Sequence, residues 1–329
     1  MPAAPRVTRP ARPHRTDVPI LRAQTVRSTA EARCGKGDER QMGFTLPTEV
    51  ERRPVAVIGA GTLGRRIALM FATRGGVVRI YDKSGPAGEA AKTYVEQHVD
   101  EVAARVEGGG PGRVEVTDDL AEALAGAWLT VEAVPERLDL KKSVFADLDA
   151  GAEPDAILAS NSSSYPTSQF IDRVAHPERV VNMHFYMPPV QNAVDLMSDG
   201  RTDPAVLAFL KEELPRYGVF PFEAHKESTG FIFNRIWAAI KRESLEVVAE
   251  GVSTPQDVDR MWEINMGTPA GPFRMMDHVG LDVVLDIEEH YAAELPGLPA
   301  APRELLRRYV DAGHLGVKTG RGFYADYPA

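Results

Sequence analysis

Short apolar runs alternate with longer amphipathic stretches over the first two thirds of the chain. The runs typical of buried strands are 55–58, 77–81, 129–133, 157–159, 180–183 and 219–222, with a further strand near Val114. Helical spacing of apolar residues between them predicts helices at 62–74, 87–105 and 138–148. Strands that alternate with helices indicate a parallel sheet covered on both faces.

The pattern changes after Glu227, where the apolar residues take a long helical spacing. One helix presents the apolar side Ile232, Ile236, Ile240 and Leu245. We therefore expect two folded domains, a sheet domain over 51–226 and a helical domain over 227–329.

Residues 1–50 have no apolar periodicity and are rich in Pro, Arg, Ser and Thr. This composition predicts a disordered N-terminal extension. The first thirty residues hold six Arg and a single acid, which leaves a targeting segment open. A misplaced start is a further alternative, because Met42 lies just before the first strand.

The charge is unevenly distributed along the chain. Residues 1–50 hold nine Lys/Arg and five Asp/Glu, so that, of a net charge of −9, residues 51–329 carry −13. This acidic body argues against nucleic acid as a partner. No apolar run approaches the roughly 18 residues of a membrane span. Cys34 is the single cysteine, which suits a reducing compartment, and we expect a cytoplasmic protein.

A glycine motif follows the first predicted strand directly. Gly59, Gly61 and Gly64 have G-x-G-x-x-G spacing between that strand and the next helix. In dinucleotide-binding turns, one glycine permits the tight turn, one lets the backbone approach the pyrophosphate, and one permits close packing of helix on strand. The motif therefore predicts a dinucleotide site.

The residues around this turn point to NAD. Thr62 and Leu63 begin the helix, where free N–H groups can bind phosphate. Asp82 lies 18 residues past Gly64, after the second strand, where a carboxylate accepts hydrogen bonds from the ribose and repels a 2′-phosphate. Lys83 next to it blurs this preference for NAD over NADP. An FAD site, or glycines that serve only as turns, are the alternatives.

Several further motifs follow in order, and together they resemble one family. They are Ser-Asn-Ser-Ser-Ser at 160–164, His-Phe-Tyr-Met-Pro at 184–188, Gly-Phe-Ile-Phe-Asn-Arg at 230–235, Gly-Pro-Phe at 271–273 and Lys-Thr-Gly-Arg-Gly-Phe-Tyr at 318–324. Over roughly 53–325 the chain resembles the 3-hydroxyacyl-CoA dehydrogenase family. The resemblance implies an α/β fold, a Rossmann-type doubly wound sheet followed by an all-α C-terminal domain, and an NAD-dependent oxidoreductase.

The resemblance also implies a catalytic set. His184 would be the general acid/base, Ser163 would bind the substrate oxygen, and Asn234 would reach the reacting groups from the second domain. A neutral histidine suits removal of a hydroxyl proton near pH 7. Asp195 would orient the imidazole and stabilise its charged form, as in catalytic triads.

Two more residues match family positions beside the cofactor, namely Glu136 and Lys141. A solvated helix face is the alternative for this pair, and a polar turn is the alternative for residues 162–164. We expect no metal, because the remaining histidines lack metal-ligand spacing. This interpretation rests on four of them, His225, His278, His290 and His314.

Three features depart from the family pattern. Met187 replaces the usual Asn after the aromatic pair, and the orienting acid is an Asp placed eleven residues after His184 instead of a Glu placed twelve after it. The third feature is the glycine-rich run at 108–112, which shortens a segment that forms a basic helical hairpin in CoA-binding members.

The expected function is interconversion of a 3-hydroxyacyl thioester and its 3-keto form by hydride transfer with NAD. Alternatives are a dehydrogenase of a free 3-hydroxy acid, gulonate- or carnitine-like, and a non-enzymatic, crystallin-like NAD-binding protein. A nucleic-acid binder acting through the basic tail is a further alternative. We expect a small-molecule substrate, no nucleic-acid or membrane partner, and a homodimer paired through the helical domain.

Overall fold

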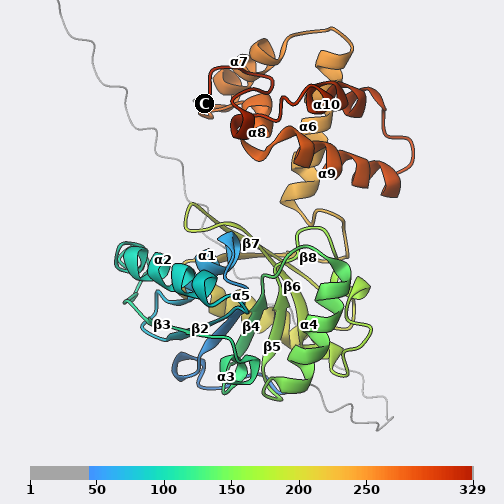
Figure 1. Cartoon of the computed structure of the whole chain (residues 1–329). Coiled ribbons are helices and arrows are strands. Elements are labelled where there is room, and N and C mark those ends of the chain that lie inside the picture. The colour runs from blue at the N-terminus through green and yellow to red at the C-terminus, as the bar shows by residue number, and fades with distance from the viewer. Residues whose placement is uncertain (1–43, 328–329) are drawn as a thin grey trace, which may run out of the picture. The chain divides into compact units, whose positions relative to one another are not determined.

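Eight strands of the described residues form one sheet in the order β3-β2-β1-β4-β5-β6-β7-β8 (Figure 1). The strands are β1 (Val55–Ile58), β2 (Val77–Tyr81), β3 (Arg113–Thr117), β4 (Leu129–Glu132), β5 (Ile157–Ser160), β6 (Val180–Met187), β7 (Gln191–Met197) and β8 (Phe220–Ala224). The computed structural model describes residues 44–327, so residues 1–43 and 328–329 lie outside the described part. The order β3-β2-β1-β4-β5-β6 is that of a Rossmann sheet.

The sheet is not wholly parallel, which corrects the expectation from the sequence. β7 runs antiparallel to β6, with His184 opposite Asp195, and β8 pairs in parallel with β7. Only residues 188–190 join β6 to β7, and so short a connection permits only an antiparallel pair. The sequence pattern missed β7 because Asp195 interrupts its buried run.

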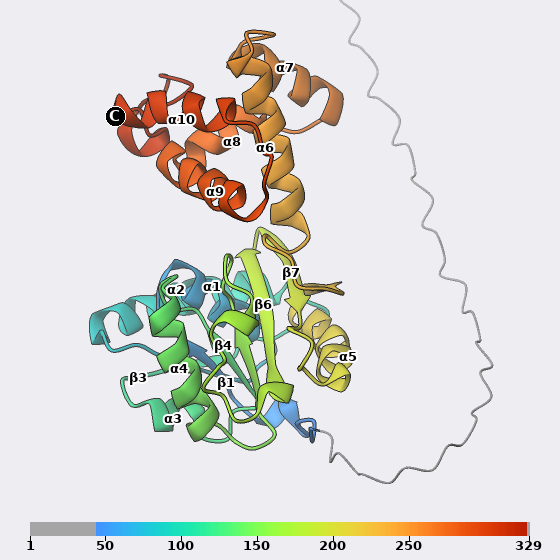
Figure 2. The ribbon, with the colours of Figure 1, turned by 90° about the vertical axis from the view of Figure 1, so that its right-hand side faces the viewer.

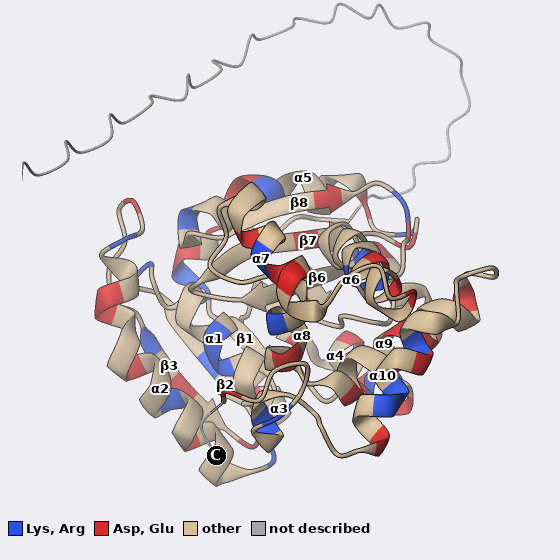
Figure 3. Cartoon of the chain, turned by 90° about the horizontal axis from the view of Figure 1, so that it is seen from above, with Lys and Arg blue, Asp and Glu red and all other residues tan. Residues whose placement is uncertain are grey.

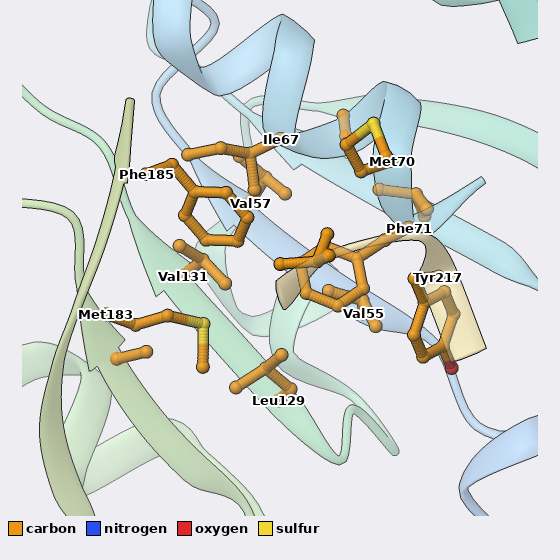
Figure 4. Packing of buried hydrophobic residues seen from close by; sticks show 14 of the residues in the cluster. Val55, Val57, Ile67, Met70, Phe71, Leu129, Val131, Met183, Phe185 and Tyr217 are labelled. Carbon is orange, nitrogen blue, oxygen red and sulfur yellow. The ribbon is translucent and has the colours of Figure 1, made fainter. Parts of the chain in front are cut away.

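Helices cover both faces of the sheet (Figures 1 and 2). One face packs against α1 (Thr62–Phe71), α2 (Gly85–Ala103) and α5 (Pro204–Glu213), and the other against α3 (Leu120–Leu124) and α4 (Leu138–Gly151). Figure 4 shows the first of these cores, where the Phe71 ring meets the edge of Phe185 and of Tyr217. The short α3 and α5 were not predicted from the sequence.

The segment 44–50 belongs to this domain, which corrects the expected extension over 1–50. Phe44 donates its backbone N–H to the Asp203 carboxylate over 3.2 Å, and Leu46 packs against the core. Val50 is itself buried. The rest of the predicted extension, with Cys34 and Met42, lies outside the described residues.

The second domain is all helical, as predicted. It contains α6 (Phe233–Ala249), α7 (Pro255–Met266), α8 (Pro272–Val279), α9 (Leu281–Glu294) and α10 (Ala301–Asp311). One short 3₁₀ turn, Val317–Thr319, lies in this domain, and the others lie in the sheet domain at Val50–Arg52, Thr167–Gln169, Pro177–Arg179 and Leu214–Tyr217. The core joins Leu245, Phe273, Leu281 and Leu306 from four of these helices.

The family-like motifs at 271–273 and 318–324 meet in this domain at the buried carboxylate of Asp259, which accepts the Phe273 N–H and the Tyr324 hydroxyl. Asp277 accepts backbone hydrogen bonds from Phe323 and Tyr324, which dock the C-terminal segment. A Cβ on Gly322 would lie 2.0 Å from the Asp277 carboxylate, so glycine is required there. These motifs therefore serve the packing of the helical domain.

Lys and Arg are interspersed with Asp and Glu over the helices (Figure 3). Arg307 of α10 forms an ion pair with Glu289 of α9, and on the sheet Arg79 of β2 pairs with Glu115 of β3. Within residues 44–327, no helix has both the length and the apolar composition needed to cross a membrane.

Candidate active site

The three glycines of the motif answer three different steric requirements. Gly59 has φ +112°, and a Cβ there would lie 2.7 Å from the Ala133 carbonyl oxygen. A Cβ on Gly64 would lie 1.8 Å from the Gly59 carbonyl oxygen, so α1 could not approach β1 with any other residue. Gly61 has open space around it, which leaves the backbone accessible to a ligand. This division of roles is that of a dinucleotide-binding turn.

The start of α1 and Asp82 complete this half of the site. Gly61 caps α1 without a side-chain hydrogen bond, so the N–H groups of Thr62 and Leu63 have no capping partner. Asp82 accepts N–H bonds from Ala60 and Ser84, each over 2.8 Å. These bonds fix the carboxylate at the edge of the turn.

A cavity of about 550 Å³ lies beside Asp82 and the glycine turn. Its walls include Gly59, Gly61, Val134 and Val144, and its charged lining residues are Asp82, Lys83 and Asp147. A largely apolar cavity beside a fixed carboxylate can hold an adenosine, so the predicted NAD site fits these residues.

Lys141 lies under the neighbouring strand end, in a network of carboxylates. Its side chain is 1% exposed, and its Nζ donates to both oxygens of Glu132 at 2.8 and 3.1 Å. Nζ also lies 3.1 Å from Glu136. Ser160 donates to Glu132 over 2.6 Å, so the end of β5 joins the same network. Lys141 is thus buried and paired, contrary to the alternative of a solvated helix face.

Glu136 reaches from this network to the serine loop. It accepts hydrogen bonds from the Ser162 hydroxyl at 2.6 Å and the Ser164 N–H at 2.9 Å. Burial raises the pKa of Glu136, but the Lys141 charge and these hydrogen bonds together outweigh it and lower the pKa. Glu136 therefore anchors the loop that carries Ser163. Sequence reasoning missed Glu132 and Ser160, although two polar residues at adjacent ends of parallel strands were a usable signal.

His184 lies near the end of β6, 5% exposed, between two aromatic rings. Its imidazole stacks on Phe231 with 5.1 Å between ring centroids, and the Tyr186 ring meets it edge to face. Phe231 has φ +53°, a left-handed conformation that costs about 1 to 2 kcal/mol in a non-glycine residue. The strained hinge between the domains thus holds one face of the imidazole, and the sequence assigned no such role to Phe231.

Asp195 lies opposite His184 across the β6–β7 ladder, but the two do not form the expected hydrogen bond. His184 Nδ1 is 3.8 Å from Asp195 Oδ2 and has no hydrogen-bond partner among residues 44–327. The same carboxylate oxygen accepts the hydroxyl of Tyr186, which the sequence did not identify. Burial, followed by the hydrogen bond and charge of Asp195, raises the pKa of Tyr186. An aspartate is one methylene shorter than the family glutamate, so it contacts Tyr186 here.

The other two predicted catalytic residues meet His184 in one cavity. This cavity of about 500 Å³ is lined by Ser163, His184 and Asn234, together with Leu63 from α1. Glu136 and Lys141 form its floor. Ser163 is solvent-exposed, and the adjacent Asn161 accepts the Phe185 N–H over 2.8 Å, which ties the serine loop to β6.

The two cavities adjoin, because Ala133 and Val134 line both. A dinucleotide with its adenosine beside Asp82 would therefore extend from the glycine turn toward His184. This arrangement can hold a cofactor against a secondary alcohol with a histidine beside it. Within residues 44–327, no group of three or more His, Cys, Asp or Glu side chains is arranged to hold a metal ion.

Both domains match models of one family. The model described as "3-hydroxyacyl-CoA dehydrogenase, NAD binding domain" matches residues 54–227. The model described as "3-hydroxyacyl-CoA dehydrogenase, C-terminal domain" matches residues 230–326. The resemblance seen in the sequence motifs is thereby confirmed, and so is NAD as the cofactor.

Individual relatives align over most of the chain. A 5-formyl-3-hydroxy-2-methylpyridine 4-carboxylate 5-dehydrogenase of Mesorhizobium japonicum is 30% identical, over 84% of this chain and 91% of its own. A probable 3-hydroxybutyryl-CoA dehydrogenase of Bacillus subtilis is 33% identical, over 84% and 98%. The crystal structure of (S)-3-hydroxybutyryl-CoA dehydrogenase PaaH1 from Ralstonia eutropha has a TM-score of 0.75 at 28% identity, over 84% of this chain and all of that one.

Proposed function

The chain belongs to the 3-hydroxyacyl-CoA dehydrogenase family, and from that premise we propose that it interconverts a 3-hydroxyacyl thioester and its 3-keto form. One observation carries the proposal. Ser163, His184 and Asn234 line a single cavity that continues into the pocket beside the glycine turn. When bound, NAD would supply the nicotinamide that accepts the hydride from the carbinol carbon of the substrate.

His184 handles the proton of the reacting hydroxyl. Its Nδ1 lies on the side of Asp195, so Nε2 is the atom left for the substrate. As Nε2 takes the proton, the Asp195 carboxylate at 3.8 Å stabilises the charge of the imidazolium. Catalytic hydrogen bonds are often long before substrate binds, so we expect His184 and Asp195 to come closer together during the reaction. Ser163 and Asn234 donate hydrogen bonds to the substrate oxygen.

Replacing His184 tests this assignment. His184→Gln should lower the rate of NADH formation by about 10²- to 10⁴-fold, the usual effect of losing a general base. NADH affinity should stay unchanged, because the glycine turn and Asp82 are untouched. The matched control is His176→Gln, whose side chain is exposed on a loop. Full activity in His184→Gln would contradict the mechanism, and NAD binding without turnover of any 3-hydroxy substrate would favour a crystallin-like role.

A free 3-hydroxy acid is the second candidate substrate. The segment that forms a basic hairpin in CoA-binding members is here the single helix α2 followed by the connection 104–112. The pyridine carboxylate named for the Mesorhizobium relative is also not an acyl thioester. Comparing a 3-hydroxyacyl-CoA with the matching free acid separates the two candidates, because only one of them should support rapid NADH formation.

We further propose that the chain forms a homodimer through its helical domain. Large apolar side chains of that domain are exposed on the single chain, and an apolar surface of this kind can serve as an interface between subunits. They are Ile232, Phe233, Ile236, Val252, Met261, Ile264, Met266, Met275, Val279, Val283 and Leu295. Sedimentation should give twice the chain mass, and Ile264→Lys should shift it toward the monomer while Val190→Lys does not. A wild-type monomer at micromolar concentration would contradict the proposal.

A further inference from the structure

A second cavity, of about 360 Å³, adjoins the catalytic one. Ser163 and Asn234 line both, so the second cavity begins where the substrate oxygen would bind. Its far wall is formed by Lys241 of α6 and by Ile287 and Tyr291 of α9. Most of the exposed lining is apolar, as expected for a site that receives the body of a small substrate.

Lys241 is the unexpected member of this wall. Its residue is 4% exposed, and it takes part in none of the ion pairs or hydrogen bonds found among residues 44–327. The nearby buried carboxylate, Glu288, accepts instead from Arg242 Nε over 2.9 Å. Burial lowers the pKa of Lys241 to about 8, an effect that the charge of Glu288 only partly offsets.

An unpaired buried ammonium group destabilises a fold unless something compensates it. The packing of the helical domain would tolerate an apolar residue at this position, since the neighbouring wall is Ile287 and Tyr291. A lysine in an otherwise apolar pocket is therefore costly for folding. This cost is understandable if a ligand supplies the missing counter-charge.

The position of Lys241 on α6 relates it to the reacting centre. It follows Asn234 by seven residues, which is two helical turns and about 10 Å along the axis. Residues seven apart share one face of a helix, and helical side chains lean toward the N-terminus, here toward Asn234. The ammonium group thus faces the same cavity as the Asn234 amide, a few carbon atoms away from the substrate oxygen.

The other charged groups near this cavity include the buried Glu288, whose Oε1 has no hydrogen-bond partner among residues 44–327. Asp286 lines the cavity but is solvent-exposed, so water and salt screen its charge. His290 pairs with Glu294 at 3.2 Å, and Arg242 pairs with Glu288. The cavity wall therefore presents the Lys241 ammonium group, whose charge the buried Glu288 offsets only in part.

We propose that Lys241 binds a carboxylate of the substrate, so that the preferred 3-hydroxy substrate is an anionic acyl compound and not a simple fatty acyl thioester. This proposal rests on the dehydrogenase function proposed above. The carboxylate has two possible sources with the same chemistry, namely the far end of a thioester-linked dicarboxylic acyl group or the C1 carboxylate of a free 3-hydroxy acid.

Three substrates distinguish these sources. They are 3-hydroxyhexanoyl-CoA, its analogue with a carboxylate in place of the terminal methyl, and free 3-hydroxyhexanoate. We expect one of the two compounds with a free carboxylate to exceed 3-hydroxyhexanoyl-CoA, whose acyl chain is uncharged, by about 10- to 100-fold in kcat/KM, the size of a hydrogen bond to a charged group. Which of the two is preferred identifies the source of the carboxylate.

The variants Lys241→Met and Lys241→Arg test the residue itself. Lys241→Met should abolish the preference and Lys241→Arg should keep most of it, while NADH affinity in both shows that the fold is intact. If 3-hydroxyhexanoyl-CoA is the best substrate, or if the preference is unchanged in Lys241→Met, the proposal is overturned and the dehydrogenase function stands. No NADH formation from any of the three overturns the dehydrogenase function and this proposal together.

Discussion

Two buried lysines line the two adjoining cavities of the candidate active site, and their surroundings differ. Lys141, under the sheet end, contacts Glu132 and Glu136 within 3.1 Å. Lys241, in the helical domain, has no ion-pair partner within residues 44–327, although Glu288 lies near it. Both are almost fully buried, so burial alone does not distinguish their roles.

This difference distinguishes a lysine that holds the site in place from a lysine that can bind a ligand. Lys141 completes an internal network, and removing it would leave carboxylates without a counter-charge. Lys241 is itself the group without a counter-charge, so removing it would relieve a penalty. A buried charge that the fold has paired is part of the scaffold, whereas one that the fold leaves unpaired is available to a ligand.

The largest expected change in stability comes from replacing Lys141, the lysine that is paired with carboxylates. Lys141→Met should lower the free energy of unfolding by about 3 to 5 kcal/mol, because Glu132 remains buried and uncompensated. Urea denaturation measures the change. The double variant with Glu132→Gln should regain much of the loss, since the stranded charge is then gone. A loss below about 1 kcal/mol would remove the contrast between the two lysines.

For Lys241, which has no ion-pair partner within residues 44–327, the change in the free energy of unfolding should have the opposite sign. Lys241→Met should raise the free energy of unfolding by about 1 to 3 kcal/mol, because the desolvation that lowers the pKa of Lys241 to about 8 is relieved. The matched control is Lys211→Met, an exposed partner of Glu223 whose loss should change stability by less than about 1 kcal/mol. A destabilised Lys241→Met would mean that the lysine supports the fold after all.

The cost of burying the Lys241 charge also predicts that the stability of the fold depends on pH. Below about pH 8 both the folded and the unfolded chain carry the Lys241 proton, so the full penalty is present. Between about pH 8 and 10.5 the unfolded chain keeps the proton and the folded chain releases it, so this group raises stability as pH rises. The stability gap between Lys241→Met and wild type should therefore narrow from pH 7 to pH 10. A gap that is constant over this range would contradict the burial of an unpaired ammonium group.

The last comparison concerns two serines that donate hydrogen bonds, one in each domain. Ser160→Ala should cost about 1.5 to 3 kcal/mol, because Ser160 donates to the charged, buried Glu132. Ser244→Ala should change stability by less than about 1 kcal/mol, since its hydroxyl only bonds back to the Ile240 carbonyl within α6. Equal costs, measured by urea denaturation, would show that the charge of the acceptor does not matter here.

Much of the fold could be predicted because its signals are local. The buried strands, the helical second domain and the three glycines follow from periodicity and from turn sterics, which neighbouring residues determine. The antiparallel β7 could not be predicted in this way. Its apolar run is broken by Asp195, a residue that is buried only because β6 and β8 flank it.

The sequence motifs named residues that lie together in the structure, but they did not predict the contacts between these residues. His184, Ser163 and Asn234 share one cavity, as the motifs implied, yet the carboxylate meant for the imidazole bonds to Tyr186. Hydrogen-bond partners depend on differences of a methylene length and an ångström. The sequence does not contain such distances.

The sequence by itself determined the sheet domain, the helical domain and the chemistry of the groups that could react. Only the tertiary structure decided which buried charges are paired, because Glu132 reaches Lys141 from another strand end and Glu288 is drawn to Arg242 instead of Lys241. The energy of a charge depends on neighbours that the chain brings together from a distance, and no local pattern records them.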